Sequence, residues 1–420
     1  MKILTWDINL KVRLIGETLF NTLFWMYFPF LTLYFSDKFG KSTAGLLMSV
    51  PPLMGIIGSL LGGFLSDRWG RRSTMLVGAF MQAGMFALFA LSIGNWFDYF
   101  AYMGISFGGS IYQPASSAMV ADLTPEKDLR NVFATFVTAI NIGAVFGPML
   151  GSIFFFHYRS ELLWTCTLVT LIYSIAIFFM IRETIPASAK KSVQSHTFSS
   201  VLKEQGKNYK IIFYDKIFAL YILAGVFVTI GFKQLNLYLA VYVKEMVPSQ
   251  TLFSWDNWSL ELSNLEVFGW IMGLNGLMFV LCVIPVTKWF EHWSDRNTFV
   301  LSSFIFGFGM FLVGFTTNIW LLFIFTFIFT IGEIMNAPVT SSFVSKYAPE
   351  KARGQYMGAS NLQYSIGRFL APLTVILSTS LSAIGVFGFV FFCMLISVGL
   401  YILLFKSMQV RNYGKNSVSL

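Results

Sequence analysis

The sequence predicts an all-α membrane protein with twelve transmembrane helices in two pseudo-symmetric six-helix halves. Three observations support this prediction. Hydrophobic residues make up 56% of the 420 residues and charged residues only 12%, about half the charged fraction of a typical soluble domain. The apolar residues come in blocks of about 20, each long enough to cross ~30 Å of hydrocarbon as a helix. Two stretches far apart in the chain also read almost the same.

Polar breaks divide the apolar sequence into twelve predicted spans. We expect helices because a backbone in lipid must satisfy its own N–H and C=O groups, and the blocks lack the alternation of barrel strands. The spans are predicted at 12–34, 43–66, 73–95, 97–121, 132–157, 161–182, 217–243, 266–288, 298–316, 319–344, 354–382 and 384–405. The first lacks a small-residue cleavage site and others follow it, so we expect a retained helix rather than a signal peptide.

Basic residues predict the orientation of the chain. Only four of the 29 Lys and Arg residues fall in the loops of the predicted outer side: Lys38, Lys41, Arg159 and Lys244. The positive-inside rule then predicts that both termini and the 183–216 loop are cytoplasmic, in a multi-pass protein of the cell membrane. The net charge of +9 reflects this topology, so we expect no nucleic-acid partner.

An internal repeat predicts the two halves. "PASSAMVADLTPEK" (114–127) and "PVTSSFVSKYAPEK" (338–351) lie 224 positions apart, and the same shift aligns "DRWGRR" (67–72) with "EHWSDR" (291–296). It also aligns Gly143 with Gly367. Such repeats place the substrate site between the halves near the bilayer midplane, and transport follows from rocking one half against the other.

The repeat and the polar composition of the central loop set the predicted domain limits. These are an N-terminal half at 1–182, a cytoplasmic linker at 183–216, a C-terminal half at 217–405 and a cytoplasmic tail at 406–420.

Two motifs resemble those of a known family. "GGFLSDRWGRR" (62–72) matches the G-x-x-x-D-R-x-G-R-R/K signature of the major facilitator superfamily, and "GAVFGPMLG" (143–151) resembles the antiporter motif of its drug/proton exchangers. "TIGEIMNAP" (330–338) resembles the corresponding helix of a lactococcal multidrug/proton antiporter. The resemblance covers the whole chain and implies the major facilitator fold.

The first motif implies gating residues on the cytoplasmic side. The set is Gly63, Asp67, Arg68, Gly70, Arg71, Arg72 and Asp122. In the family, the residue matching Asp67 docks on the N-terminus of helix 11, where the helix dipole favours a carboxylate. The residues matching Arg71 and Asp122 form an ion pair that holds the outward-open state. The second copy has Ser294 and Asp295 in place of Gly70 and Arg71, which predicts a strong latch in one half only. Topological anchoring of the loop is the alternative reading.

The second motif predicts close helix packing. Gly143, Gly147 and Gly151 share one helix face, so a neighbouring backbone can approach closely. Pro148 removes one helix hydrogen bond and favours a bend. The resemblance adds that this contact seals the transport pathway against leaks.

Glu333 is the strongest single site prediction. It lies about 11 residues from the cytoplasmic end of its span, roughly 16 Å deep at 1.5 Å per residue. A carboxylate at that depth is costly unless paired, hydrated or protonated, which favours a proton-binding or cation-binding role. The alternative is a structural ion pair with Arg368, which we expect at a similar depth. Such a pair could also act as a switch on protonation.

Other polar residues inside the spans complete the predicted site. They are Lys233, Asn236, Asn336, Gln113, Asn141 and Gln363. A buried amide needs partners, and a cavity supplies substrate or water. Lys233 could instead extend toward the outer surface. For Glu17 we expect an i,i+4 pair with Arg13 at the membrane interface, with a proton site as the alternative.

The predicted function is export of amphipathic small organic compounds, as in multidrug efflux, in exchange for protons by alternating access. The proton gradient is the expected energy source, because the chain lacks G-x-x-x-x-G-K-[ST] and so no ATP use is expected. We predict no cofactor, no metal cluster, no enzyme activity, membrane lipids as surroundings and a monomer. The alternatives are a specific porter for a sugar conjugate, lipid or anionic metabolite, and a non-transporting receptor.

Overall fold

The computed structural model describes residues 6–125, 128–185, 203, 206, 214–256, 258–290, 292–349 and 352–416. Most of the predicted linker, the last four residues of the predicted tail and Glu291 lie outside this set. The chain divides into two compact units, unit 1 with Met1–Phe39 and Val50–Lys203, and unit 2 with Gly40–Ser49 and Glu204–Leu420. The predicted domain limits stay predictions.

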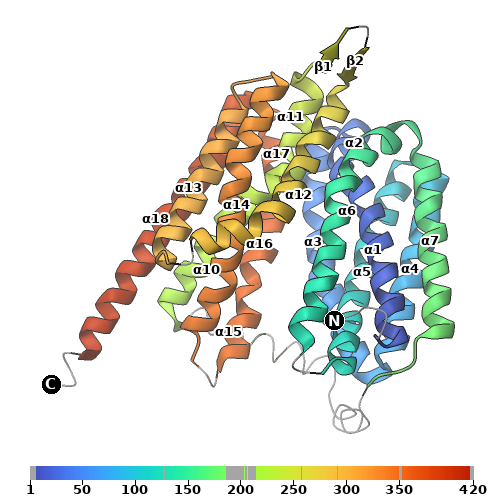
Figure 1. Ribbon diagram of the computed structural model, residues 1–420, viewed down its shortest axis with the longest axis horizontal. Helices are drawn as coiled ribbons and strands as arrows, with labels where there is room; N and C mark the ends of the chain where they lie inside the picture. The colour runs from blue at the N-terminus through green and yellow to red at the C-terminus, as the bar shows by residue number, and fades with distance from the viewer. Residues whose placement is uncertain are drawn as a thin grey trace. The chain divides into compact units, whose positions relative to one another are not determined.

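Unit 1 is built from helices (Figure 1). Its elements, with the start of α3 shared with unit 2, are α1 (Ile8–Tyr27), η2 (Phe28–Phe30), α2 (Leu31–Phe39), α3 (Lys41–Trp69), α4 (Arg71–Leu91), α5 (Asn95–Leu123), α6 (Leu129–His157) and α7 (Arg159–Met180).

Unit 2 contains helices and one hairpin (Figure 1). Its elements are α10 (Lys216–Phe232), η4 (Lys233–Asn236), α11 (Tyr238–Met246), β1 (Gln250–Trp255), β2 (Trp258–Leu262), α12 (Asn264–Trp289), α13 (Asp295–Val313), α14 (Ile319–Tyr347), α15 (Arg353–Ser360), α16 (Leu362–Leu370), α17 (Leu373–Leu377) and α18 (Ala383–Asn416). The antiparallel hairpin β1–β2 occupies a segment for which the sequence predicted only a loop.

The two units repeat the same helix pairings. In unit 1, α4 packs on α5 and α7, and α1 packs on α6 and α7. In unit 2, α13 packs on α14 and α18, and α10 packs on α16 and α18. In terms of the predicted spans, span 3 packs on spans 4 and 6, and span 1 packs on spans 5 and 6. In unit 2 their counterparts pack in the same way, span 9 on spans 10 and 12, and span 7 on spans 11 and 12. The predicted fold class is confirmed.

Three predicted spans are interrupted rather than continuous. The first changes from α1 through the 3-10 turn η2 to α2 at Pro29, which has no N–H for the helix ladder. The eleventh consists of α15, α16 and α17, with Pro372 directly before α17. The seventh changes from α10 through η4 to α11. The apolar blocks predicted the extent of these spans but not their interruptions.

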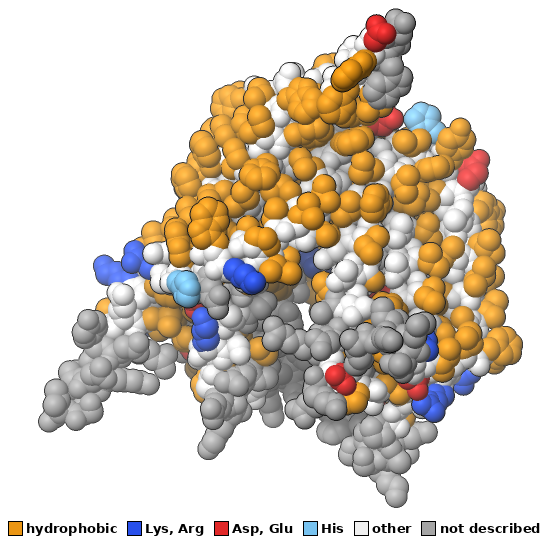
Figure 2. Space-filling model, in the orientation of Figure 1, with side chains coloured by type: hydrophobic (Ala, Val, Ile, Leu, Met, Phe, Trp, Pro, Cys, Tyr) orange, Lys and Arg blue, Asp and Glu red, His pale blue; other side chains and the backbone are white. Residues whose placement is uncertain are grey.

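The outer surface of the helices is apolar. Exposed large side chains follow one face of α7 at three-residue and four-residue spacing: Trp164, Leu168, Ile172, Ile175 and Phe179. Soluble monomers rarely expose such a patch, and Figure 2 shows hydrophobic side chains over most of the helical surface on the face drawn. Nine helices of the described ranges are long and apolar enough to cross a membrane. This surface is therefore suited to contact lipid.

The predicted glycine packing is confirmed between α6 and α1. A Cβ atom on Gly147 would lie 2.4 Å from Cβ of Trp25 and 3.0 Å from the carbonyl oxygen of Thr22. A Cβ atom on Gly143 would lie 2.8 Å from the backbone nitrogen of Thr22. Gly367, the counterpart of Gly143, makes the same close approach in unit 2, between α16 and α10.

Substitution of Gly147 by Ala is therefore expected to destabilise the protein by about 1–3 kcal/mol through overpacking. Gly84 is the matched control, because a Cβ atom there meets nothing within 4 Å. Gly84→Ala should leave thermal unfolding in detergent unchanged or slightly raised. Equal unfolding temperatures for the two variants would show that the α1–α6 contact does not need the missing side chain.

Candidate functional site

Glu333 lies inside unit 2, at the middle residue of α14. It lines a cavity of about 240 Å³ whose walls come from α10, α12, α14, α16 and α18. Oxygen-bearing side chains on this wall are Thr229, Glu333, Asn336, Thr340 and Gln363, and aromatic ones are Phe232, Phe279, Tyr364 and Tyr401. Three predicted site residues, Glu333, Asn336 and Gln363, are thus brought together in one cavity.

Asn275 of α12 holds the Glu333 carboxylate in place. Its Nδ2 donates to Oε2 of Glu333 at 3.1 Å and to Oγ1 of Thr330 at 3.0 Å. Thr330 precedes Glu333 by three residues, so both acceptors lie on the same face of α14. Only one carboxylate oxygen is used by this contact. The alternative that Glu333 forms a structural ion pair with Arg368 is wrong, because no such pair within 4.0 Å joins these two described residues.

Two amides on the cavity wall are fixed by further hydrogen bonds. Asn336 donates to Oγ of Ser302 at 3.2 Å and accepts from Thr340 at 2.9 Å. Gln363 donates to the hydroxyl of Tyr221 at 3.3 Å. Gln363 also depends on Gly225, because a Cβ atom there would lie 1.6 Å from its Oε1. The cavity is therefore lined by oriented groups rather than by mobile ones.

Lys233 lies close to this cavity, in the turn η4. Its charge interacts with the charges of Glu333 and Arg368, at distances beyond an ion pair in the described part of the chain. The interruption of span 7 thus places an ammonium group near the Glu333 carboxylate. This position favours a role inside unit 2 over extension of Lys233 toward the outer surface.

Gln234 joins the interruptions of spans 7 and 11. Its side chain is fully buried. Its Nε2 donates to the carbonyl oxygen of Ile230 at 2.8 Å and to that of Ala371 at 3.3 Å. Its Oε1 accepts from Thr374 at 2.6 Å. Interrupted membrane helices leave backbone groups that need such partners, so one side chain stabilises both breaks.

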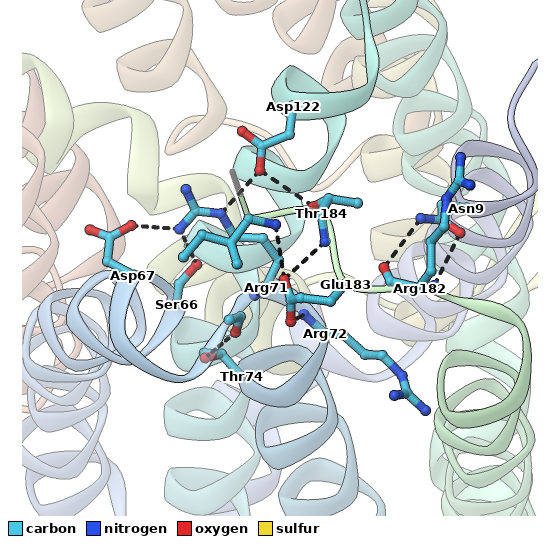
Figure 3. Close-up of polar contacts among 12 residues, drawn as sticks. Asn9, Ser66, Asp67, Arg71, Arg72, Thr74, Asp122, Arg182, Glu183 and Thr184 are labelled. Carbon is cyan, nitrogen blue, oxygen red and sulfur yellow. Dashed lines mark hydrogen bonds and ion pairs between the residues drawn. The ribbon is translucent and has the colours of Figure 1, made fainter. Parts of the chain in front are cut away.

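A polar cluster on the predicted cytoplasmic side of unit 1 is centred on Arg71, as Figure 3 shows. We call Ser66, Asp67, Arg71, Asp122 and Glu183 the Arg71 cluster. Nε of Arg71 lies 3.2 Å from Asp122, and Nη1 donates to Ser66 at 2.9 Å and to Asp67. The ion pair between Arg71 and Asp122 that the family resemblance implied is present. The docking of Asp67 on span 11 stays a prediction.

Glu183 explains why position 70 is glycine. The Glu183 carboxylate accepts from the backbone N–H groups of Arg71 at 2.8 Å and Arg72 at 3.3 Å, and so caps the start of α4. Gly70 has a φ of 103°, and a Cβ atom there would lie 2.1 Å from Oε2 of Glu183. Glycine is required both by the conformation and by the cap. The sequence alone did not identify Glu183, which comes from the far end of unit 1.

Unit 2 contains a counterpart of this ion pair with the charges exchanged. Nζ of Lys346 lies 3.1 Å from Asp295, and these positions match Asp122 and Arg71 under the shift of 224. Ser294, in the place of Gly70, caps α13 with its own side chain. Both units therefore carry an ion pair at these positions, and the expectation of a strong latch in one half only stays a prediction.

The two pairs differ in exposure, which predicts different strengths. The side chains of Arg71 and Asp122 are 11% and 18% exposed, whereas those of Lys346 and Asp295 are 65% and 25% exposed. Exposed ion pairs contribute ~0–1 kcal/mol to stability because water and salt screen the charges. The Arg71–Asp122 pair is less exposed and therefore less screened, so we expect it to be the stronger of the two. Asp122→Asn should therefore slow transport in reconstituted vesicles by about tenfold, and Asp295→Asn by less than about threefold. A larger effect of Asp295→Asn would contradict this ranking.

The remaining predicted site residues do not line the Glu333 cavity. Gln113 lines a second cavity, of about 220 Å³, in unit 1. Asn141 of α6 and Asn236 of η4 line neither of these two cavities. Gly63 and Arg68 lie in α3, and Arg72 in α4 donates to the backbone of Phe178. Asn275 and Gln234 have structural roles that the sequence did not assign. The signal in the sequence that points to them is that an amide in a membrane helix needs hydrogen-bond partners.

Arg13 and Glu17 pair as predicted, with Nη2 of Arg13 3.2 Å from Oε2 of Glu17. The side chains are 3% and 6% exposed, because Phe136 of α6 covers the guanidinium, whose carbon lies 4.3 Å from the ring centre. Their depth in the membrane stays a prediction.

Comparisons with known proteins agree with this architecture. The profile of the Major Facilitator Superfamily matches residues 14–255 and 249–419. A "Na(+), Li(+), K(+)/H(+) antiporter" of Planococcus maritimus is 37% identical over 383 residues, covering 89% of this chain and 90% of that protein. "Multidrug resistance protein MdtH" of Yersinia pestis (strain Pestoides F) is 23% identical, covering 82% and 80%.

A solved structure shows the same fold at low sequence identity. A POT family transporter in complex with a thioalcohol-conjugated peptide superposes with a TM-score of 0.76 at 16% identity, covering 94% of this chain and 95% of that chain. The matched family and this structure are transporters, not enzymes.

Proposed function

The chain belongs to the major facilitator superfamily of membrane transporters, and we propose that it exchanges monovalent metal cations for protons at the Glu333 cavity. The observation that carries this proposal is the single carboxylate held inside unit 2, with one oxygen bound by Asn275 and oxygen-bearing side chains on the surrounding wall. The proton gradient is the proposed energy source.

Charge balance explains why such a site would couple the two ions. An ionised carboxylate inside a membrane is costly, and either a proton or a metal cation removes its charge. Both cannot occupy the same carboxylate oxygen. A transporter that changes conformation only with Glu333 neutralised must therefore carry a cation one way and a proton the other.

The cavity's chemistry supports a small, hard cation. Hard cations prefer oxygen ligands, and ion sites in membrane proteins replace the hydration shell with protein oxygens. Glu333, Asn336, Thr229 and Thr340 bring such atoms to one cavity. Its volume of about 240 Å³ is below the ~300–1,000 Å³ of sites for drug-sized ligands. Lys233 nearby weakens the hold on a cation, which favours release.

Export of amphipathic compounds in exchange for protons is the second candidate. Four aromatic side chains on the same wall favour it: Phe232, Phe279, Tyr364 and Tyr401. Three likenesses also support it: the antiporter motif at 143–151, the likeness of 330–338 to the lactococcal drug antiporter and the similarity to the Yersinia multidrug resistance protein.

One assay separates the two candidates. Everted membrane vesicles with an acid interior are monitored by a pH-sensitive dye while NaCl, LiCl, KCl or choline chloride is added. Cation exchange predicts loss of the pH gradient on addition of at least one metal chloride but not of choline chloride. A response to ethidium alone would instead support drug export, and no response to any salt would contradict the proposal.

A further inference from the structure

Unit 1 contains a second buried polar site, separate from the Glu333 cavity. A cavity of about 220 Å³ lies among α1, α4, α5, α6 and α7. The side chains that matter on its wall are Glu17 and Asn21 from α1, Gln82 from α4 and Thr170 from α7. Neither the gating cluster nor the packing glycines use them.

The Glu17 carboxylate is incompletely paired. Nη2 of Arg13 donates to its Oε1 at 3.3 Å, and Oε2 accepts no hydrogen bond although it lies 3.2 Å from the same nitrogen. Because the side chain is 94% buried, this oxygen has no access to bulk water, and a buried acceptor left unsatisfied is costly. The cavity is the remaining direction from which a partner can come.

The neighbouring polar side chains also present oxygen atoms. Nδ2 of Asn21 donates to the carbonyl oxygen of Glu17 at 2.8 Å, and Nε2 of Gln82 donates to that of Ile105 at 3.2 Å. These bonds fix which end of each amide is nitrogen, and no hydrogen bond to either amide oxygen is found among the described residues. The Thr170 hydroxyl is buried without a partner. Among the side chains on the cavity wall the unused groups are therefore mainly acceptors, whereas Arg13, which is not part of the wall, leaves its Nε and Nη1 without a partner among the described residues.

We propose that this cavity is a second monovalent metal cation site, with Glu17, Asn21, Gln82 and Thr170 as its ligands. Four oxygens of this kind match the ligand preference of hard cations. Arg13 balances the carboxylate when no cation is bound, and its guanidinium is also held by the ring of Phe136. The assignment of the ion as a monovalent metal cation rests on the proposed function. The evidence that a site exists comes only from residues of unit 1.

Equilibrium binding of radioactive sodium to the purified full chain in detergent tests this site. We expect two sodium ions per wild-type chain, one for Glu17→Gln, one for Glu333→Gln and none for the double variant. Two ions retained by Glu17→Gln would overturn the inference. Two ions retained by Glu333→Gln but one by Glu17→Gln would contradict the proposed function and leave the second site standing.

A milder variant keeps the test decisive if Glu17→Gln does not fold. Thr170→Val removes a hydroxyl that makes no hydrogen bond to any described residue, so the fold should persist. In a Glu333→Gln background, where only the unit 1 site remains, it should weaken sodium binding about fivefold, as expected for one neutral ligand of ~1 kcal/mol. Thr167→Val is the control on the same helix, because Thr167 bonds only to Leu163. Equal affinities for the two valine variants would overturn the inference.

Discussion

Glu333→Gln is expected to abolish sodium/proton exchange in reconstituted vesicles. Glutamine fits the same space and can still bond Asn275, but it can neither take up a proton nor balance a cation. Loss of a charged ligand costs about 3 kcal/mol, which corresponds to a roughly 100-fold lower cation affinity. The rate of pH change driven by a sodium gradient is the measurement.

Glu261→Gln is the control for this substitution. Glu261 lies exposed in strand β2 of the same unit, so its loss should leave exchange within about twofold of wild type. Glu333→Asp retains the charge but draws it back from Asn275, and an intermediate rate is expected. Wild-type exchange by Glu333→Gln would remove the carboxylate from the mechanism.

Gln234→Leu is expected to cause the second-largest loss, through the structure of unit 2. The substitution removes the bonds to Ile230, Ala371 and Thr374 and leaves their partners unsatisfied away from water. At ~1 kcal/mol for each such bond, the free energy of unfolding should fall by about 2–4 kcal/mol. Thermal unfolding in detergent and the exchange rate should both drop.

Thr374→Val provides a graded comparison, because it removes the bonds from the Thr374 hydroxyl to Gln234 and to the carbonyl oxygen of Ala371 but keeps the two bonds that Gln234 itself donates. Its effect should be about a third of that of Gln234→Leu. If Gln234→Leu unfolds at the wild-type temperature and transports normally, the two helix interruptions do not depend on this side chain.

The fold was largely predictable because its signals are local and repeated. Long apolar blocks define the spans, and the shift of 224 predicts equivalent packing in the two units, as Gly143 and Gly367 show. The ion pair of unit 2 was missed because residue identity was compared position by position. Lys346 and Asp295 preserve the interaction while exchanging the charges.

The candidate site was predicted in part. Glu333, Asn336 and Gln363 do meet in one cavity, since polar residues deep in membrane helices need partners. The interruption of span 7 was not predictable from proline, because no proline lies in that segment; it depends on Gln234 contacts made with a segment 137 residues away. The burial of Arg13 and Glu17 likewise depends on Phe136, a tertiary contact.

Competition between protons and sodium tests most directly whether one carboxylate serves both ions. The sodium concentration for half-maximal exchange is measured across a series of pH values on the acidic side of the activity range. If Glu333 binds either ion, this concentration rises by about tenfold for each unit of pH decrease, while the maximal rate at saturating sodium stays unchanged. A half-maximal concentration that does not change with pH would mean that the two ions bind at separate groups, and the account would be contradicted.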